Sequence, residues 1–90
     1  MQLSCTMSVE ELYQKGMESF NSSDFENAAN ILKQAVDTDE NHVESWKSYG
    51  YALHKLGKFS DAFDALDKAY SMDPEDTMVK MKRDDAAKKK

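Results

Sequence analysis

The fold is decided by residues 43–76, which read VESWKSYGYALHKLGKFSDAFDALDKAYSMDPED. Residues 9–42, which read VEELYQKGMESFNSSDFENAANILKQAVDTDENH, repeat that stretch at an offset of 34 positions. Periods of about 20–50 residues are typical of proteins built from stacked repeats. Eight positions are identical, and most are apolar or glycine: Val9/Val43, Glu10/Glu44, Gly16/Gly50, Phe25/Phe59, Ala28/Ala62, Leu32/Leu66, Ala35/Ala69 and Asp39/Asp73. The matches concentrate where side chains must pack, so we interpret the copies as two structural repeats.

Apolar residues recur at spacings of three and four within each copy, which predicts amphipathic helices. Gly16 and Gly50 interrupt this pattern at equivalent positions. A glycine in the middle of a helix costs about 1 kcal/mol relative to alanine, so its recurrence needs a reason. We expect two helices to approach closely there, with the small residues Ala28 and Ala62 as the contacts.

Helix-capping residues divide each copy into two helices. A serine or asparagine followed three residues later by glutamate resembles a capping box, in which each side chain bonds the other residue's backbone N–H. Three such pairs occur: Ser8 with Glu11, Ser23 with Glu26, and Asn41 with Glu44. Gly57 can supply the left-handed residue that closes a helix. Asp73 before Pro74 predicts a cap followed by proline at the first helical position.

These signals predict five helices, over about residues 9–21, 24–38, 42–56, 59–72 and 74–88. The connections between them are short, so consecutive helices must be antiparallel. The chain holds only one proline and three glycines, which disfavours a turn-rich β-sandwich. The expected fold class is all-α.

The second copy carries Trp46-x2-Tyr49-Gly50-x2-Leu53 and then Ala62-x3-Leu66-x2-Ala69-x4-Pro74. This pattern resembles the tetratricopeptide repeat (TPR). The first copy matches it less well, with Leu12 at the tryptophan position and Glu40 at the proline position.

The resemblance implies a right-handed superhelical array of antiparallel helix hairpins. On this basis the chain divides into an N-terminal extension (1–8), a first repeat (9–42), a second repeat (43–76) and a capping helix with a basic tail (77–90). Met78 and Met81 would lie on one face of that last helix. Trp46 occupies the family's large core position, so we expect it in the core.

Composition excludes several classes of function. The net charge of −5 disfavours non-specific binding to nucleic acid. The single Cys5 cannot form an internal disulfide, and the sequence shows no spacing of metal ligands, no phosphate-binding loop and no nucleophile–base pair. No apolar run approaches the roughly 20 residues that span a bilayer. We therefore expect a cytoplasmic protein that is not an enzyme and binds no cofactor or metal.

The TPR resemblance implies that the first helix of each pair lines a concave groove for a partner protein. The groove residues would be Tyr13, Met17, Phe20, Lys47, Ser48, Tyr51, His54, Met78, Met81 and Lys82, with Glu10, Glu44 and Lys55 also on this face. Aromatic and methionine side chains suit a partner helix or peptide. We expect His54 to be an ordinary surface imidazole.

Other roles remain open beside this scaffold or adaptor function. Two repeats and a cap fall short of the three repeats that stacks usually need, so the same groove could mediate a homodimer. The basic residues 82–90 could contact RNA or acidic lipid. One TPR branch binds the C-terminal carboxylate of chaperones, but at its clamp positions this chain has only one cation, Lys82, and no asparagine, which makes a co-chaperone role the least favoured.

Overall fold

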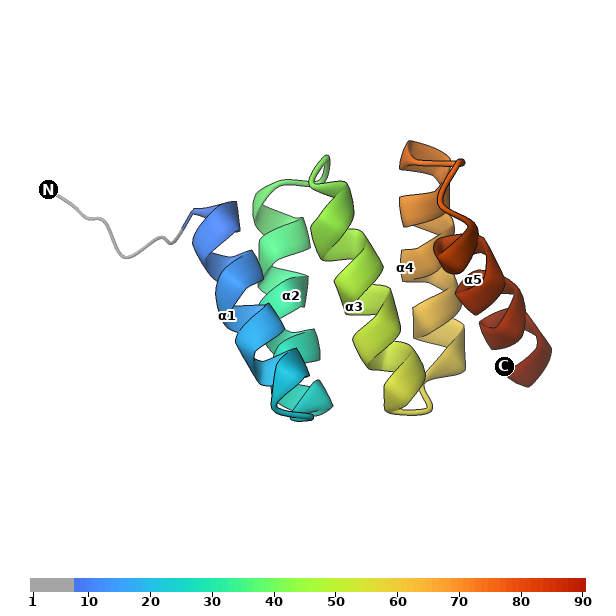
Figure 1. Cartoon of the computed structure of the whole chain (residues 1–90), viewed down its shortest axis with the longest axis horizontal. Helices are drawn as coiled ribbons and strands as arrows, with labels where there is room; N and C mark the ends of the chain where they lie inside the picture. Colours follow the sequence, from blue (N-terminus) through green and yellow to red (C-terminus); the bar gives the residue numbers. More distant parts are fainter. Residues whose placement is uncertain (1–7) are drawn as a thin grey trace, which may run out of the picture.

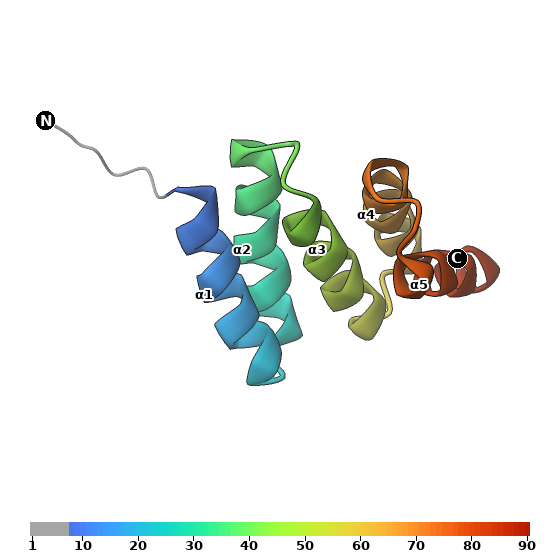
Figure 2. The same cartoon turned by 45° about the horizontal axis from the view of Figure 1, so that its top comes forward.

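The computed structural model describes residues 8–90, which form five α-helices joined by short connections. The helices are α1 (Val9–Asn21), α2 (Phe25–Thr38), α3 (Val43–Lys55), α4 (Phe59–Met72) and α5 (Thr77–Lys89). Figure 1 shows each helix running opposite to the one before it, and Figure 2 shows α5 at the end of the array far from α1. The described residues contain no strand, so the predicted all-α repeat fold is confirmed.

The 34-residue period of the sequence is also the period of the structure. α3 begins and ends 34 residues after α1, and α5 begins and ends 34 residues after α3. The residues that cap these helices, Ser8, His42 and Asp76, follow the same spacing. The last helix therefore has the phase of the first helix of a third repeat.

The capping box at the start of α1 is confirmed. The backbone N–H of Glu11 donates to Ser8 Oγ at 3.3 Å, and the backbone N–H of Ser8 donates to Glu11 Oε1 at 3.4 Å. Two backbone donors that a helix start leaves unpaired are satisfied in this way.

The loop inside each hairpin turns through one left-handed residue. Gly57 has φ +81°, as predicted, and Ser23 at the equivalent position of the first repeat has φ +66°. That backbone conformation removes Ser23 from the cap, because an N-cap residue has negative φ. Asp24 caps α2 instead and accepts the N–H of Asn27 at 3.3 Å, so the predicted pairing of Ser23 with Glu26 is wrong.

The cap of α3 also differs from the prediction. His42 Nδ1 accepts the N–H of Ser45 at 3.2 Å and lies 2.6 Å from Ser45 Oγ. The ring of Tyr13 meets the His42 ring edge-on at 5.3 Å, and this packing holds the imidazole at the helix end. The predicted pairing of Asn41 with Glu44 is therefore wrong.

α5 begins three residues later than predicted. Asp73 donates its backbone N–H to Ala69 O at 2.9 Å and so closes α4 rather than opening the next helix. Asp76 is the actual cap, with Oδ1 accepting the N–H of Val79 at 3.2 Å. Pro74 lies in the connection between the helices.

The core runs through the middle of the array. Leu32, Leu66 and Val79 are fully buried, one each on α2, α4 and α5. Val79 and Ala86 pack α5 onto α4. Met78 and Met81 take no part in this contact and are 58% and 69% exposed.

The two mid-helix glycines lie where the helices of each hairpin meet. A Cβ on Gly16 would lie 2.6 Å from Leu32 Cγ, and one on Gly50 would lie 2.6 Å from Leu66 Cγ. The expected close approach is confirmed. The contacted residues are these leucines rather than Ala28 and Ala62, because the leucine side chains reach across to the facing helix.

Replacing Gly16 with alanine tests this contact. Helix propensity alone favours the substitution by about 1 kcal/mol. The clash with the buried Leu32 side chain should outweigh this gain. The net effect should be a free energy of unfolding that is lower by roughly 1–2 kcal/mol. Urea unfolding followed by circular dichroism measures the effect.

The matched control is the same substitution in a Leu32→Ala background. In that background the Leu32 side-chain atoms that the new Cβ would contact are absent. Gly16→Ala should then leave the free energy of unfolding unchanged or raise it. Stabilisation by Gly16→Ala in the otherwise unchanged chain would contradict the close approach.

Candidate functional site

The predicted groove residues of α1 and α3 include a half-buried apolar group. Tyr13, Phe20 and Tyr51 pack against the main core cluster with part of each side chain exposed. Met17 is half-buried as well. Burial raises the pKa of the Tyr51 phenol above its ordinary value, so the side chain is neutral near pH 7. These residues offer an apolar surface with polar edges.

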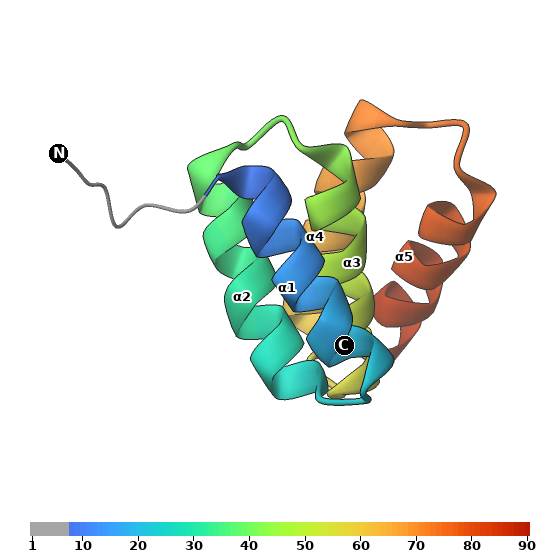
Figure 3. The same ribbon diagram turned by 60° about the vertical axis from the view of Figure 1, so that its left-hand side comes forward.

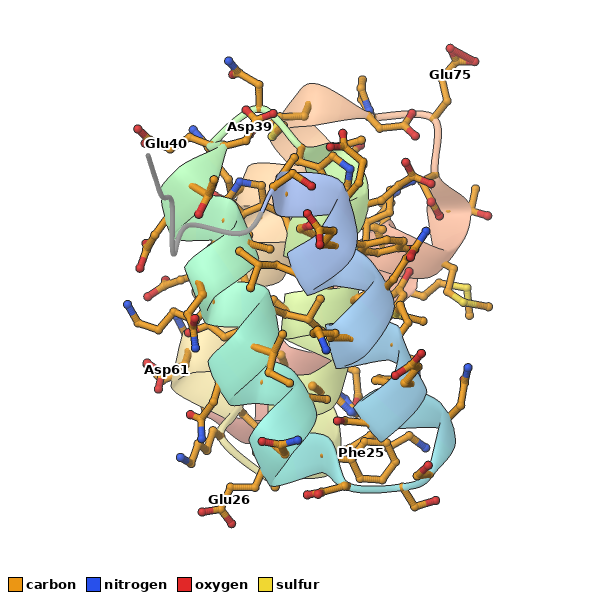
Figure 4. All side chains as sticks on the ribbon, turned by 90° about the vertical axis from the view of Figure 1, so that its left-hand side faces the viewer. Phe25, Glu26, Asp39, Glu40, Asp61 and Glu75 are labelled. Atoms are coloured by element: carbon orange, nitrogen blue, oxygen red, sulfur yellow. The ribbon has the colours of Figure 1, made fainter. Side chains whose placement is uncertain are left out.

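Phe20 packs against another aromatic ring of its own hairpin. Its ring meets the Phe25 ring edge-on at 5.2 Å, across the loop between α1 and α2. Figure 4 shows Phe25 at the lower end of the molecule, beside that loop. Phe20 therefore contributes to hairpin packing at this end.

Lys47 is committed to an internal ion-pair network. Its Nζ lies 2.6 Å from Asp76 Oδ2 and 3.0 Å from Asp73 Oδ2. The hydrogen bond to Asp76 raises the pKa of Lys47, and the same bond lowers the pKa of Asp76. This ammonium fastens α3 to the connection between α4 and α5, so it is not a free cation for a partner.

His54 is also engaged within the chain. Its Nε2 lies 2.5 Å from Asp85 Oδ2, and its ring meets the Phe59 ring edge-on at 5.2 Å. The expectation of an ordinary surface imidazole is therefore wrong. The hydrogen bond to His54 lowers the pKa of Asp85, which also pairs with Lys89 at 3.4 Å.

The remaining predicted residues do not share one environment. Ser48 is 6% exposed, which leaves too little surface for a partner to contact. Met81 and Lys82 line a shallow hollow of about 440 Å³ on α5, and Met78 is exposed on the same helix. Figure 3 shows α3 between α1 and α5, and the contacts of α3 with both helices agree with this order, so the exposed side chains of α5 lie beyond the α1–α3 group.

A second ion-pair network fixes α5 and was not anticipated from the sequence. Arg83 Nη1 lies 3.1 Å from Asp67 on α4, and Nη2 lies 3.3 Å from the neighbouring Asp84. The guanidinium carbon is 4.6 Å from the centre of the Tyr70 ring. The 16-residue separation of Arg83 and Asp67 exceeds a helix turn, so no local spacing rule indicates the pair.

Trp46 packs against the main core cluster, as expected, but it is not enclosed in it. It is half-buried, its Nε1 donates to Glu40 O at 2.8 Å, and it lines a hollow on the outer side of α3. The lining also includes two pairs of acidic residues, each pair spaced by three on its own segment: Asp37 with Glu40 and Asp61 with Asp64. Each acidic pair can be recognised in the sequence alone by this spacing of three.

The described residues show neither a metal site nor a membrane span. Within residues 8–90, no cluster of three His, Cys, Asp or Glu side chains is arranged to hold a metal ion. Each helix of that same range is too short or too polar to cross a lipid bilayer. Cys5, the single cysteine, lies outside the described residues.

One family model matches residues 3–69, and that family is described as anaphase-promoting complex, cyclosome, subunit 3 (ANAPC3). The match covers more than half of the chain. The chain belongs to the ANAPC3 family. Because this is a family of TPR-like repeats, the resemblance to the TPR is confirmed. Membership in the ANAPC3 family also supports a general role in protein interaction. A comparison with curated proteins found no match.

The Lys47 network predicts a pH-dependent stability. Lys47→Met leaves two carboxylates without their cation and should lower the free energy of unfolding by roughly 1 kcal/mol at pH 7. The pKa of Asp76 is lowered in the folded chain, so this stability is present above the unfolded value of about 4 and is lost as the pH falls through the folded value. The difference between the variant and the unaltered chain should therefore shrink towards pH 3.

Lys55→Met is the matched control, since Lys55 is exposed on the same helix. Its effect in urea unfolding should be small at both pH values. If Lys47→Met lowers the free energy of unfolding as much at pH 3 as at pH 7, the ion pairs are not the cause of the lost stability.

Proposed function

We propose that the chain is a non-catalytic binding module that takes a helical or extended segment of a partner protein on the face formed by α1 and α3. The observation that carries this proposal is the half-buried group of Tyr13, Met17 and Tyr51. These side chains project from the first helix of each hairpin, where the TPR resemblance places the ligand. We further propose a cytoplasmic location.

The chemistry of this face favours an apolar ligand with a few polar contacts. Tyrosine buries a large apolar area and keeps a hydroxyl for hydrogen bonding. Methionine adapts its shape to the surface that it meets. Because Lys47 and His54 are bonded to Asp73, Asp76 and Asp85, they are engaged within the chain rather than available as ligand contacts. A clamp for a terminal carboxylate needs several free cations, so this face does not suit one.

Tyr51→Ala tests the binding face. Affinity capture from a cytosolic extract, quantified by mass spectrometry, should recover partners on the unaltered chain that are depleted at least about fivefold on the variant, as expected for loss of an aromatic contact. Far-ultraviolet circular dichroism should show the same helicity for both chains. Glu75→Ala, which alters an exposed residue elsewhere, is the control and should retain the partners. Equal recovery on Tyr51→Ala would contradict the proposal.

Self-association is a second candidate, favoured by one observation. Met78 and Met81 are the large apolar residues that are mostly exposed among residues 8–90, and both lie on α5. Burying two methionines against a second copy would remove apolar surface from water.

Sedimentation velocity across a concentration range tests this candidate. A concentration-dependent dimer that Met78→Gln with Met81→Gln abolishes would support it. A chain that remains monomeric at millimolar concentration would exclude it and leave the α1–α3 face as the binding surface.

A further inference from the structure

A groove runs along the outer side of α3, between α2 and α4. Its wider part has a volume of about 570 Å³, and a smaller hollow of about 200 Å³ shares Lys33, Tyr49 and Asp61 with it. The lining comes from α2, α3, α4 and the connection between α2 and α3, whereas the face proposed for the first ligand lies on α1 and α3. The groove is therefore a separate surface.

The floor of the wider part is apolar. Trp46 and Tyr49 lie with ring centres 6.3 Å apart and ring planes tilted by 58°, beside the buried Val36 and Ala65. Burial raises the pKa of the Tyr49 phenol, so this ring is neutral near pH 7. Both aromatic side chains therefore line the space that a ligand would occupy.

The rim of the groove is acidic. Asp37 and Glu40 stand on the α2 side, and Asp61 and Asp64 stand on α4. Figure 4 shows Glu40 and Asp61 projecting from the same side of the molecule. Lys33 lies 3.4 Å from Asp37 and offsets that charge. Among residues 8–90, no ion pair engages Glu40, Asp61 or Asp64.

Lys68 is the one other cation that lines the wider part of the groove within the described chain. Three carboxylates without ion pairs therefore face one ammonium across an apolar floor. An anionic ligand would be repelled by this rim. A neutral apolar ligand would displace water from the carboxylates without replacing the hydrogen bonds that the water made, which costs free energy.

We propose that this groove binds a basic amphipathic helix of a partner protein, with apolar side chains on the floor and lysine or arginine side chains at the acidic rim. A cation over the Trp46 face gains a cation–π interaction as well as the attraction of the carboxylates. The chain uses this interaction elsewhere, between α4 and the end of α5, where Lys90 Nζ lies 4.0 Å from the centre of the Phe63 ring. A helix laid in a groove of this kind is a common mode of peptide recognition.

Trp46 makes the proposal measurable, because it is the single tryptophan of the chain and lies in the groove. The probe is a capped amphipathic peptide of roughly twelve residues, about the length of α3, with leucine and lysine at helical spacing. Titration into the full chain should give a saturable change in Trp46 emission. The same peptide with every lysine acetylated should bind at least about tenfold more weakly, and added salt should weaken the unmodified peptide.

The variants are chosen to leave the fold intact. Glu40→Gln with Asp64→Asn removes two exposed carboxylates and should lower the affinity about fivefold or more. Glu18→Gln with Glu75→Gln makes the same change of charge at exposed positions outside the groove and should have no such effect. Figure 4 shows Glu75 on the opposite side from Glu40. Tyr51→Ala should bind the peptide normally, which separates this groove from the α1–α3 face.

Three results would overturn the proposal. Equal affinity for the acetylated peptide would show that charge plays no part. An absence of any emission change up to about millimolar peptide would show that the groove does not take it. Trp46 emission that depends on the concentration of the chain alone would assign the groove to a second copy.

Discussion

The close approach of a glycine and a leucine fixes the geometry of each hairpin. Gly16 faces Leu32, and Gly50 faces Leu66, at distances that leave no room for a Cβ. The contact sets how near the two helices lie and which faces remain outside. α5 carries Asp84 at the position equivalent to Gly50, and that residue is exposed and paired with Arg83. With aspartate at this position, a leucine side chain of another helix cannot pack here as Leu66 packs on Gly50. The outer face of α5 is therefore suited to contact with solvent.

One helix supplies both proposed interaction surfaces. On α3, Trp46 and Tyr49 face the groove between α2 and α4, while Tyr51 belongs to the face shared with α1. Lys47 and His54 lie on the α5 side and are bonded to Asp76 and Asp85. Because α3 packs on α2 and α4 and is bonded to α5, three neighbouring helices fix its position, and a rigid element presents both surfaces. Rigid presentation lowers the entropy cost of binding.

The sequence predicted the fold better than the site, for physical reasons. Periodicity and the recurrent Gly16 and Gly50 report packing that every copy must satisfy, so the helices and their order followed directly. The caps at Asp24 and His42 depend on backbone angles and on a ring from another helix, which local patterns do not encode. The roles of Lys47 and His54 depend on partners 26 to 31 residues away, and their commitment to internal bonds reduced the predicted groove to a smaller apolar group. The two acidic pairs beside Trp46 can be found in the sequence, but they are far apart along the chain. Only the folded structure shows that both pairs line the same groove.

The measurement that tests the central claim most directly is a nuclear Overhauser spectrum of the full chain. Glycine–leucine contacts fix the spacing of each hairpin and thereby its exposed faces. Strong cross-peaks are expected between the α protons of Gly16 and the methyl groups of Leu32, and between those of Gly50 and Leu66. Spectra of a folded helical chain that lack both sets of cross-peaks would mean that the helices pack in another way, and the assignment of both surfaces would fail with them.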